Sequence, residues 1–221
     1  MTAPHRGRCL IINNHYFDKL EKRDGSEMDV KNISRVFKDL NFVCEVKTNL
    51  TSQEMLETIR EETKNPGYAE VGCRVIRCDT FVERWDTMGQ YTSDTASTVS
   101  DAQVSTPSSN TEDQPQTVES PFPGDYLSTD DLYIMKASFL SFKSTRHSRQ
   151  GTWFIRAIVV ALYKHSCHRD IQTIFKQVKK KVRDKSMLAH KMYAHFRGQQ
   201  PTDECFFTGD RKLYLFPGFN P

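Results

Sequence analysis

The sequence lacks any long hydrophobic run, and this absence excludes one class of protein at the start. No stretch of 18 or more apolar residues occurs among the 221 residues, whereas a helix that spans a membrane needs about 20. The beginning of the chain also lacks the apolar core and the cleavage site of a secretory signal peptide. We therefore expect a cytoplasmic protein with no membrane partner, whose six cysteines are free thiols and not a disulfide framework.

Basic residues are missing from the middle of the chain. Residues 85–131 hold nine acids and no Lys or Arg, and the segment consists mostly of Ser, Thr, Asp, Gln and Pro. Such a composition cannot bury enough apolar surface to offset the entropy lost on ordering. We predict that residues 85–130 form an acidic, disordered linker between one region at 1–84 and another at 131–221.

The region after the linker is basic. Residues 132–221 hold 17 basic and five acidic side chains, so this part could attract nucleic acid. Its Lys and Arg residues follow helical patterns, however, without the interleaved aromatic residues that stack on bases. We interpret them as a solvated face and predict no nucleic acid partner.

The first region begins as alternating strands and helices. Residues 8–14 form a short apolar run that two asparagines close, as in a buried parallel strand. Apolar residues then recur at three- and four-residue spacing over residues 28–40, which predicts an amphipathic helix. Residues 42–46 follow as a second strand.

A second helix is marked at its start and at its end. Thr51 and Glu54 have the spacing of a capping box, and the Asn-Pro-Gly sequence at 65–67 stops a helix. The apolar stripe of this helix is predicted to consist of Met55, Leu56 and Ile59. The first region therefore has the pattern of half of a doubly wound α/β fold.

The second region contains two helices between two strands. Residues 132–138 predict a strand, and residues 151–166 predict a helix with one broad apolar face. Asp170 is placed to cap the next helix. The inward-facing positions of that helix are predicted to be Ile171, Ile174, Phe175, Val178 and Val182. A last strand, at residues 211–217, is implied by the resemblance of its motif to that of a known family.

Several motifs in these regions resemble the caspases, the aspartate-directed cysteine peptidases. Residues 9–17 read CLIINNHYF and residues 23–29 read RDGSEMD, similar to the family's C-L-I-I-N-N-x-x-F and R-x-G-[TS]-x-x-D. Residues 142–156, FKSTRHSRQGTWFIR, resemble Y-V-S-W-R-N-x-x-x-G-S-W-F-I-Q. Gln200-Pro201 and residues 211–217 resemble the family's closing Q-x-P and K-K-L-Y-F-x-P. The resemblance implies a caspase-like three-layer α/β/α sandwich.

The catalytic motifs of that family are missing from this sequence. Neither Ser-His-Gly nor Gln-Ala-Cys-x-Gly occurs, and no histidine lies between His15 and His147. A cysteine nucleophile needs a base, since a free thiol with a pKa near 8.5 is mostly protonated at neutral pH. We predict no convincing catalytic residue. Cys73 is the nearest candidate, either as a degraded nucleophile motif or as the start of the strand that bears the family's histidine.

The substrate-binding side of the family pattern is partly kept. The resemblance assigns Arg23, Ser144 and Arg146 to the site that holds the aspartate before the cut, and paired arginines suit a carboxylate. The glutamine that precedes the nucleophile is missing, and Thr145 replaces an aromatic residue. We predict no metal and no cofactor.

The missing segment also affects the predicted sheet. Caspase strands run in the order 2-1-3-4-5-6, and the third and fourth carry the histidine and the cysteine. Only residues 68–79 stand between the second helix and the linker. We therefore predict an incomplete fold with two central strands missing or degraded, which leaves exposed strand edges.

Three functions are compatible with this pattern. The first is an inactive, shortened caspase-family protein of apoptosis and proteolysis. The second is a non-enzymatic regulator that dimerises with an active caspase, or with itself, through the closing strand. The third is an active cysteine endopeptidase that cleaves Asp-containing proteins, either through Cys73 or because the sequence given is a shortened form.

Overall fold

The structure is a computed structural model of the chain. The residues that it describes are 5–18, 22–64, 73–78, 131–139, 144–192 and 198–216. The elements of the first region are β1 (Gly7–Asn13), α1 (Ser26–Asp39), β2 (Phe42–Thr48), α2 (Ser52–Lys64) and β3 (Cys73–Cys78). Those of the second are β4 (Tyr133–Lys136), β5 (Arg146–His147), β6 (Gly151–Thr152), α4 (Trp153–His165), α5 (Ile171–Met192) and β7 (Thr202–Cys205). The predicted linker at 85–130 lies outside the described residues.

The first region forms a three-stranded parallel sheet with β1 in the centre. The strand order is β2-β1-β3, and the register places Gly7 opposite both Phe42 and Cys73. Side chains of the central strand are buried on both faces, which explains why its sequence is an unbroken apolar run. The strands predicted at 8–14 and 42–46 are confirmed.

Helix α1 covers one face of this sheet and has the predicted bounds to within two residues. Its apolar stripe buries Ile33, Val36 and Phe37. The backbone turns into the left-handed region at both ends, at Gly25 with φ 86° and at Asn41 with φ 64°. Glycine and asparagine adopt that conformation most readily, so these two residues set the length of the helix.

Helix α2 covers the opposite face, and its capping box is confirmed. The Glu54 carboxylate accepts hydrogen bonds from the Thr51 amide at 2.7 Å and the Thr51 hydroxyl at 2.8 Å. The predicted apolar stripe is wrong at Leu56, which is exposed. The apolar stripe that α2 packs on the sheet is narrower than predicted. Glu62 of this helix is buried beside the stripe and accepts a hydrogen bond from Arg8 at 2.9 Å.

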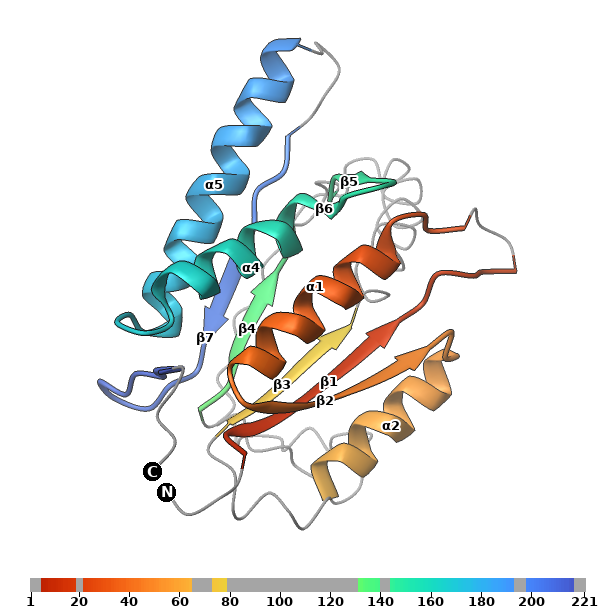
Figure 1. The fold of residues 1–221 in the computed structure, drawn as a ribbon, viewed down its shortest axis with the longest axis vertical. Helices are drawn as coiled ribbons and strands as arrows, with labels where there is room; N and C mark the ends of the chain where they lie inside the picture. The colour runs from red at the N-terminus through yellow and green to blue at the C-terminus, as the bar shows by residue number, and fades with distance from the viewer. Residues whose placement is uncertain are drawn as a thin grey trace, which may run out of the picture.

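The second region packs onto the same core. Figure 1 shows α4 beside α1 on one side of the strands, with α2 on the other, which is the predicted three-layer arrangement. One cluster of buried side chains draws on β1, α1, α4 and α5. The predicted cap of α5 is confirmed by a hydrogen bond from the Thr173 amide to the Asp170 carboxylate at 2.9 Å. All five side chains predicted to face inward on this helix are buried.

The described strands form three sheets, which are the parallel sheet β2-β1-β3, the pair β4-β7 and the short β5-β6 hairpin. β3 pairs in parallel with β1, so a third strand is present beside the first two. β4 pairs antiparallel with β7, and within the described part of the chain β3 and β4 are not paired with each other. Figure 1 shows these two strands as neighbours. The break in the hydrogen-bonded sheet therefore falls between β3 and β4, where the sequence places the missing segment.

The closing strand was predicted at the wrong place. The strand that pairs with β4 is β7, whereas the described part of 211–217 forms only an isolated bridge between Tyr214 and Asp170. Leu215 of this segment is buried in the core cluster, and Leu213 packs against it. The motif that implied a strand by family resemblance therefore lies in an irregular segment, which these two leucines hold onto the core.

No helix in the described part of the chain is long and apolar enough to cross a membrane.

Candidate functional site

Arg23 lies on the turn between β1 and α1, at the carboxyl end of the parallel sheet. Its side chain is only 8% exposed, and its guanidinium donates a hydrogen bond to the Asn14 carbonyl at 3.3 Å. Its backbone amide donates to the His15 carbonyl at 3.0 Å. The cation is thus fixed to the residues that follow β1, where ligands bind in open α/β sheets.

Arg146 lies on the β5–β6 hairpin, and this hairpin rests against the turn that carries Arg23. The contact occurs at Gly25, where an added Cβ would lie 2.6 Å from the His147 carbonyl oxygen and 2.7 Å from that of Ser148. Only glycine leaves room for the hairpin at this point. The positive φ of Gly25 is a second reason for glycine here. The structure therefore brings together the two segments that carry the predicted arginines.

Asp29 of α1 holds the hairpin in place. Its carboxylate is 1% exposed and accepts the Thr152 amide hydrogen bond on both oxygens, at 2.9 and 3.1 Å. An added Cβ at Gly151 would lie 2.3 Å from one of these oxygens, so the hairpin backbone approaches the carboxylate closely. Arg77 of β3, itself buried, lies 4.0 Å from the same carboxylate. Three elements far apart in the sequence thus meet at one acidic side chain.

Gln199 fixes the residues just before Arg146. Its side-chain oxygen accepts a hydrogen bond from the Thr145 amide at 2.9 Å. Its side-chain nitrogen donates to the Ala137 carbonyl at 2.8 Å and to the Ser144 hydroxyl at 3.3 Å. The glutamine is buried, so these bonds are shielded from water. Gln199 therefore holds the backbone beside Arg146 and the side chain of Ser144, while Arg23 is held by the residues that follow β1.

Cys73 lies at the opposite end of the sheet from the arginines. It is the first residue of β3 and pairs with Gly7 at the start of β1, whereas Arg23 follows the end of β1. Six residues of strand separate the two ends by about 17 Å. Burial raises the pKa of the Cys73 thiol to about 11, and the nearby Arg6 opposes this only in part. At neutral pH this sulfur stays protonated, and it lies far from the arginines. Neither its pKa nor its position favours it as a nucleophile.

A contact between a cysteine and a histidine occurs elsewhere in the molecule. The Cys167 sulfur lies 3.1 Å from Nδ1 of His168 in the exposed turn after α4. Helix α4 starts at the hairpin and runs for 13 residues, about 20 Å, before reaching this turn. The pair is therefore remote from the arginines. His147 lies on the hairpin itself, where its Nδ1 accepts the Arg149 amide at 3.1 Å.

The positioning residues were not predicted, although the sequence contained signals for three of them. Gly25 and Asp29 are the glycine and the aspartate of the R-x-G-[TS]-x-x-D motif. Gln199 is the glutamine of the Q-x-P motif. Arg77 carried no signal. In the described residues no group of three or more His, Cys, Asp or Glu side chains could hold a metal ion.

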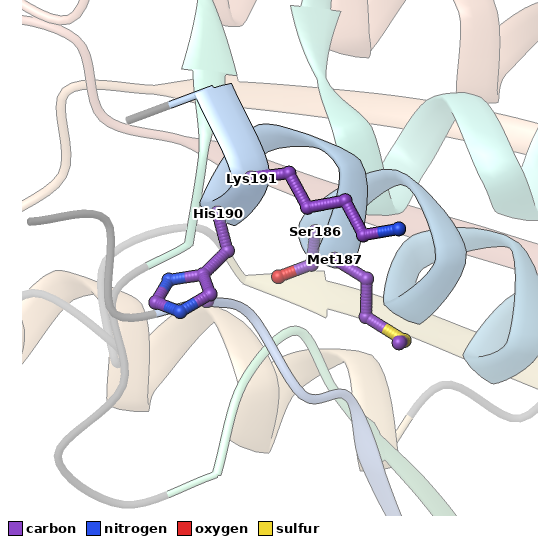
Figure 2. Close-up of a pocket in the computed structure, with 5 residues that line it drawn as sticks. Ser186, Met187, His190 and Lys191 are labelled. Atoms are coloured by element: carbon purple, nitrogen blue, oxygen red, sulfur yellow. The ribbon is translucent and has the colours of Figure 1, made fainter. Parts of the chain in front are cut away.

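The hollow drawn in Figure 2 lies elsewhere, at the end of α5, and does not include either predicted arginine. The residues that line it are Ser186, Met187, His190, Lys191 and Gly198. The candidate site is therefore the surface formed by the Arg23 turn and the Arg146 hairpin at the carboxyl end of the sheet, and not this hollow.

Comparison with known proteins gives one family. The model of the Caspase domain family matches residues 6–77 and 86–210. Caspase-10 of Homo sapiens is 37% identical over 76 residues, which cover 34% of this chain and 15% of that protein. Caspase-1 of Spodoptera frugiperda is 25% identical over 213 residues, which cover 82% of this chain and 69% of that protein.

The fold is shared with a solved structure. The crystal structure of Caspase-1 from Spodoptera frugiperda matches with a TM-score of 0.64 at 21% identity, covering 97% of this chain and 94% of that one. The coverage of the first curated relatives is much smaller, since the matched parts span only 15% and 14% of their lengths.

Proposed function

The chain belongs to the caspase family, and from this membership we propose that it is a catalytically inactive member that still recognises aspartate in extended peptide segments. The observation that carries the proposal is the contact between the Arg23 turn and the Arg146 hairpin, with Gly25 and Asp29 between them. Two guanidinium groups can hold a carboxylate by charge-assisted hydrogen bonds. The ligand would be a peptide with an aspartate side chain, in the setting of apoptosis and regulated proteolysis.

The absence of both catalytic motifs from the sequence supports inactivity. Cysteine-peptidase chemistry needs a thiolate, a base within hydrogen-bond reach and donors for the oxyanion. Cys73 lies at the far end of β3, and burial keeps its thiol protonated at neutral pH. A peptide held at the arginines would thus be bound and not cut.

A second candidate function is a non-enzymatic regulator that pairs with an active caspase, or with itself, through the end of the chain. The observation that favours it is the position of β7, which pairs on one side with β4 and forms the edge of the two-stranded sheet in the described residues. An edge strand can add a strand from a partner. The described cysteines are free thiols, which fits a reducing compartment and supports a cytoplasmic location.

The test is a binding measurement with two short fluorescent peptides that differ only by Asp and Asn at one position. We expect fluorescence polarisation to show tighter binding of the Asp peptide. Arg146→Ala should weaken it by about tenfold to a hundredfold, because it removes charge-assisted hydrogen bonds. Arg149→Ala, an exposed arginine on the same hairpin, is the matched control and should bind normally.

Two outcomes would contradict the proposal. Equal binding of the Asp and Asn peptides would show that the arginines do not read the carboxylate. Hydrolysis of the Asp peptide that disappears in Cys73→Ala would show that the chain is an active enzyme with Cys73 as its nucleophile.

A further inference from the structure

The last two turns of α5 carry a surface stripe with an unusual order of residues. Asp184, Met187, Leu188 and Lys191 line one shallow hollow, and their spacing of three, four and seven residues places them on one face of the helix. Met187 is 57% exposed and Leu188 is 60% exposed. An apolar pair thus lies between an acid on one side and a base on the other.

Contacts on the other sides of α5 fix which way this stripe faces. Ser186 is buried and its hydroxyl accepts the Gln199 amide hydrogen bond at 2.6 Å. The Lys185 ammonium lies 4.6 Å from the centre of the Trp153 ring. Figure 2 shows Met187 and Lys191 projecting to one side of the helix. The helix therefore cannot rotate to bury the stripe against its own chain without breaking these contacts.

We propose that this stripe is an interface with a second copy of the chain, formed by two antiparallel α5 helices. A two-fold axis between positions 187 and 188 would place each Asp184 opposite Lys191 of the other copy, and each Met187 opposite Leu188 of the other copy. Two Asp184–Lys191 ion pairs then form across the interface, and the apolar residues meet between them. A surface that complements itself in this way is what a two-fold dimer requires.

The charge order favours a second copy over other occupants. An acidic helix, an anionic membrane or a nucleic acid would each bring negative charge against Asp184. The Asp184 carboxylate has one exposed neighbour, Arg183, at 4.0 Å, and an exposed contact of that length competes only weakly. Lys176, Lys180 and Lys181 precede the stripe and are exposed, and Lys179 is already paired with Asp203.

The proposal is tested by a charge exchange on the full chain. Asp184→Lys gives a copy with two lysines on the stripe, and Lys191→Asp gives a copy with two aspartates. Each variant alone would place like charges together twice, so sedimentation velocity should show self-association about tenfold to thirtyfold weaker than that of the wild type. An equimolar mixture of the two should associate about as tightly as the wild type, because opposite charges meet again.

The apolar centre is tested separately. Leu188→Asp should abolish the association, while Lys180→Asp, which changes a charge outside the stripe, should leave it unchanged. Self-association that is the same in the wild type and in every stripe variant would overturn the proposal, since it would lie at another surface, such as the β7 edge. A wild type that stays monomeric, or a mixture that associates no better than its components, would overturn it as well.

Discussion

Replacing Asp29 by alanine should uncouple the hairpin that carries Arg146 from the rest of the molecule. The change leaves the buried Thr152 amide without its acceptor, and it leaves the buried Arg77 without the carboxylate that lies 4.0 Å away. Removing one partner of a buried ion pair costs about 3–5 kcal/mol in the free energy of unfolding. Arg77 has other contacts as well, so we expect the lower end, about 3 kcal/mol. This is a large part of the stability of a typical domain, which is about 5–15 kcal/mol.

The assay is urea unfolding followed by far-ultraviolet circular dichroism, together with binding of the Asp peptide at low urea. Asp39→Ala is the matched control, because Asp39 lies on the same helix and accepts a hydrogen bond from the Tyr163 hydroxyl at 2.5 Å but is exposed. It should cost less than about 1 kcal/mol. Asp29→Asn keeps an acceptor for the Thr152 amide but loses the charge beside Arg77, so its loss should be intermediate.

The reasoning would be refuted if Asp29→Ala unfolded within about 0.5 kcal/mol of Asp39→Ala, since surface substitutions normally fall in that range. It would also be refuted if Asp29→Ala lost stability but bound the Asp peptide like the wild type at low urea. In that case the carboxylate would stabilise the core without positioning the hairpin.

Two further predictions concern other parts of the fold. Burial by itself raises the pKa of Asp203, but hydrogen bonds from Lys179 and Tyr133 outweigh this effect and leave the pKa below its ordinary value of 3.8. The stability advantage of the wild type over Asp203→Asn should therefore be full above pH 4 and shrink as the pH falls below 3.8. An advantage that is constant from about pH 6 to 3 would contradict this. Because burial raises the pKa of Cys73 to about 11, iodoacetamide at pH 7.5 should label it far more slowly than the exposed Cys167. Mass spectrometry of the digested protein measures both labelling rates. Equal rates would show that the Cys73 thiol is accessible and ionised.

The elements of the fold were predictable where the signal is local. The apolar run of β1, the capping box of Thr51 and Glu54, and the stripe of α5 each depend on residues within one or two turns of each other. Leu56 was mispredicted because its exposure depends on how α2 sits on the sheet, and that is set by Glu62 and Arg8. The closing strand was mispredicted because it was inferred from a family motif, whereas in this chain Leu213 and Leu215 hold an irregular segment onto the core.

The candidate site was predictable only through family motifs. Arg23 and Arg146 are 123 positions apart in the sequence, and nothing local to either residue indicates that the segments that carry them meet. Their proximity comes from the space left by Gly25 and from the bond between Asp29 and Thr152, which has the same separation. Hydrophobic periodicity carries no information on a contact of this kind. The R-x-G-[TS]-x-x-D motif carries that information, because it contains Gly25 and Asp29 together with Arg23.

The position of these contacts is consistent with the proposed function, in which the chain recognises a peptide without cutting it. The sheet is broken between β3 and β4, and the family's catalytic residues belong to the strands at that break. The arginine hairpin has its supports elsewhere, in the first turn of α1 and in Gln199. The β2-β1-β3 sheet and the β4-β7 sheet stay together through the side chains of α1, α4 and α5, which form one core. Under the proposed function, a loss at the break would remove the chemistry and leave the proposed anion-binding surface supported by contacts among the described residues.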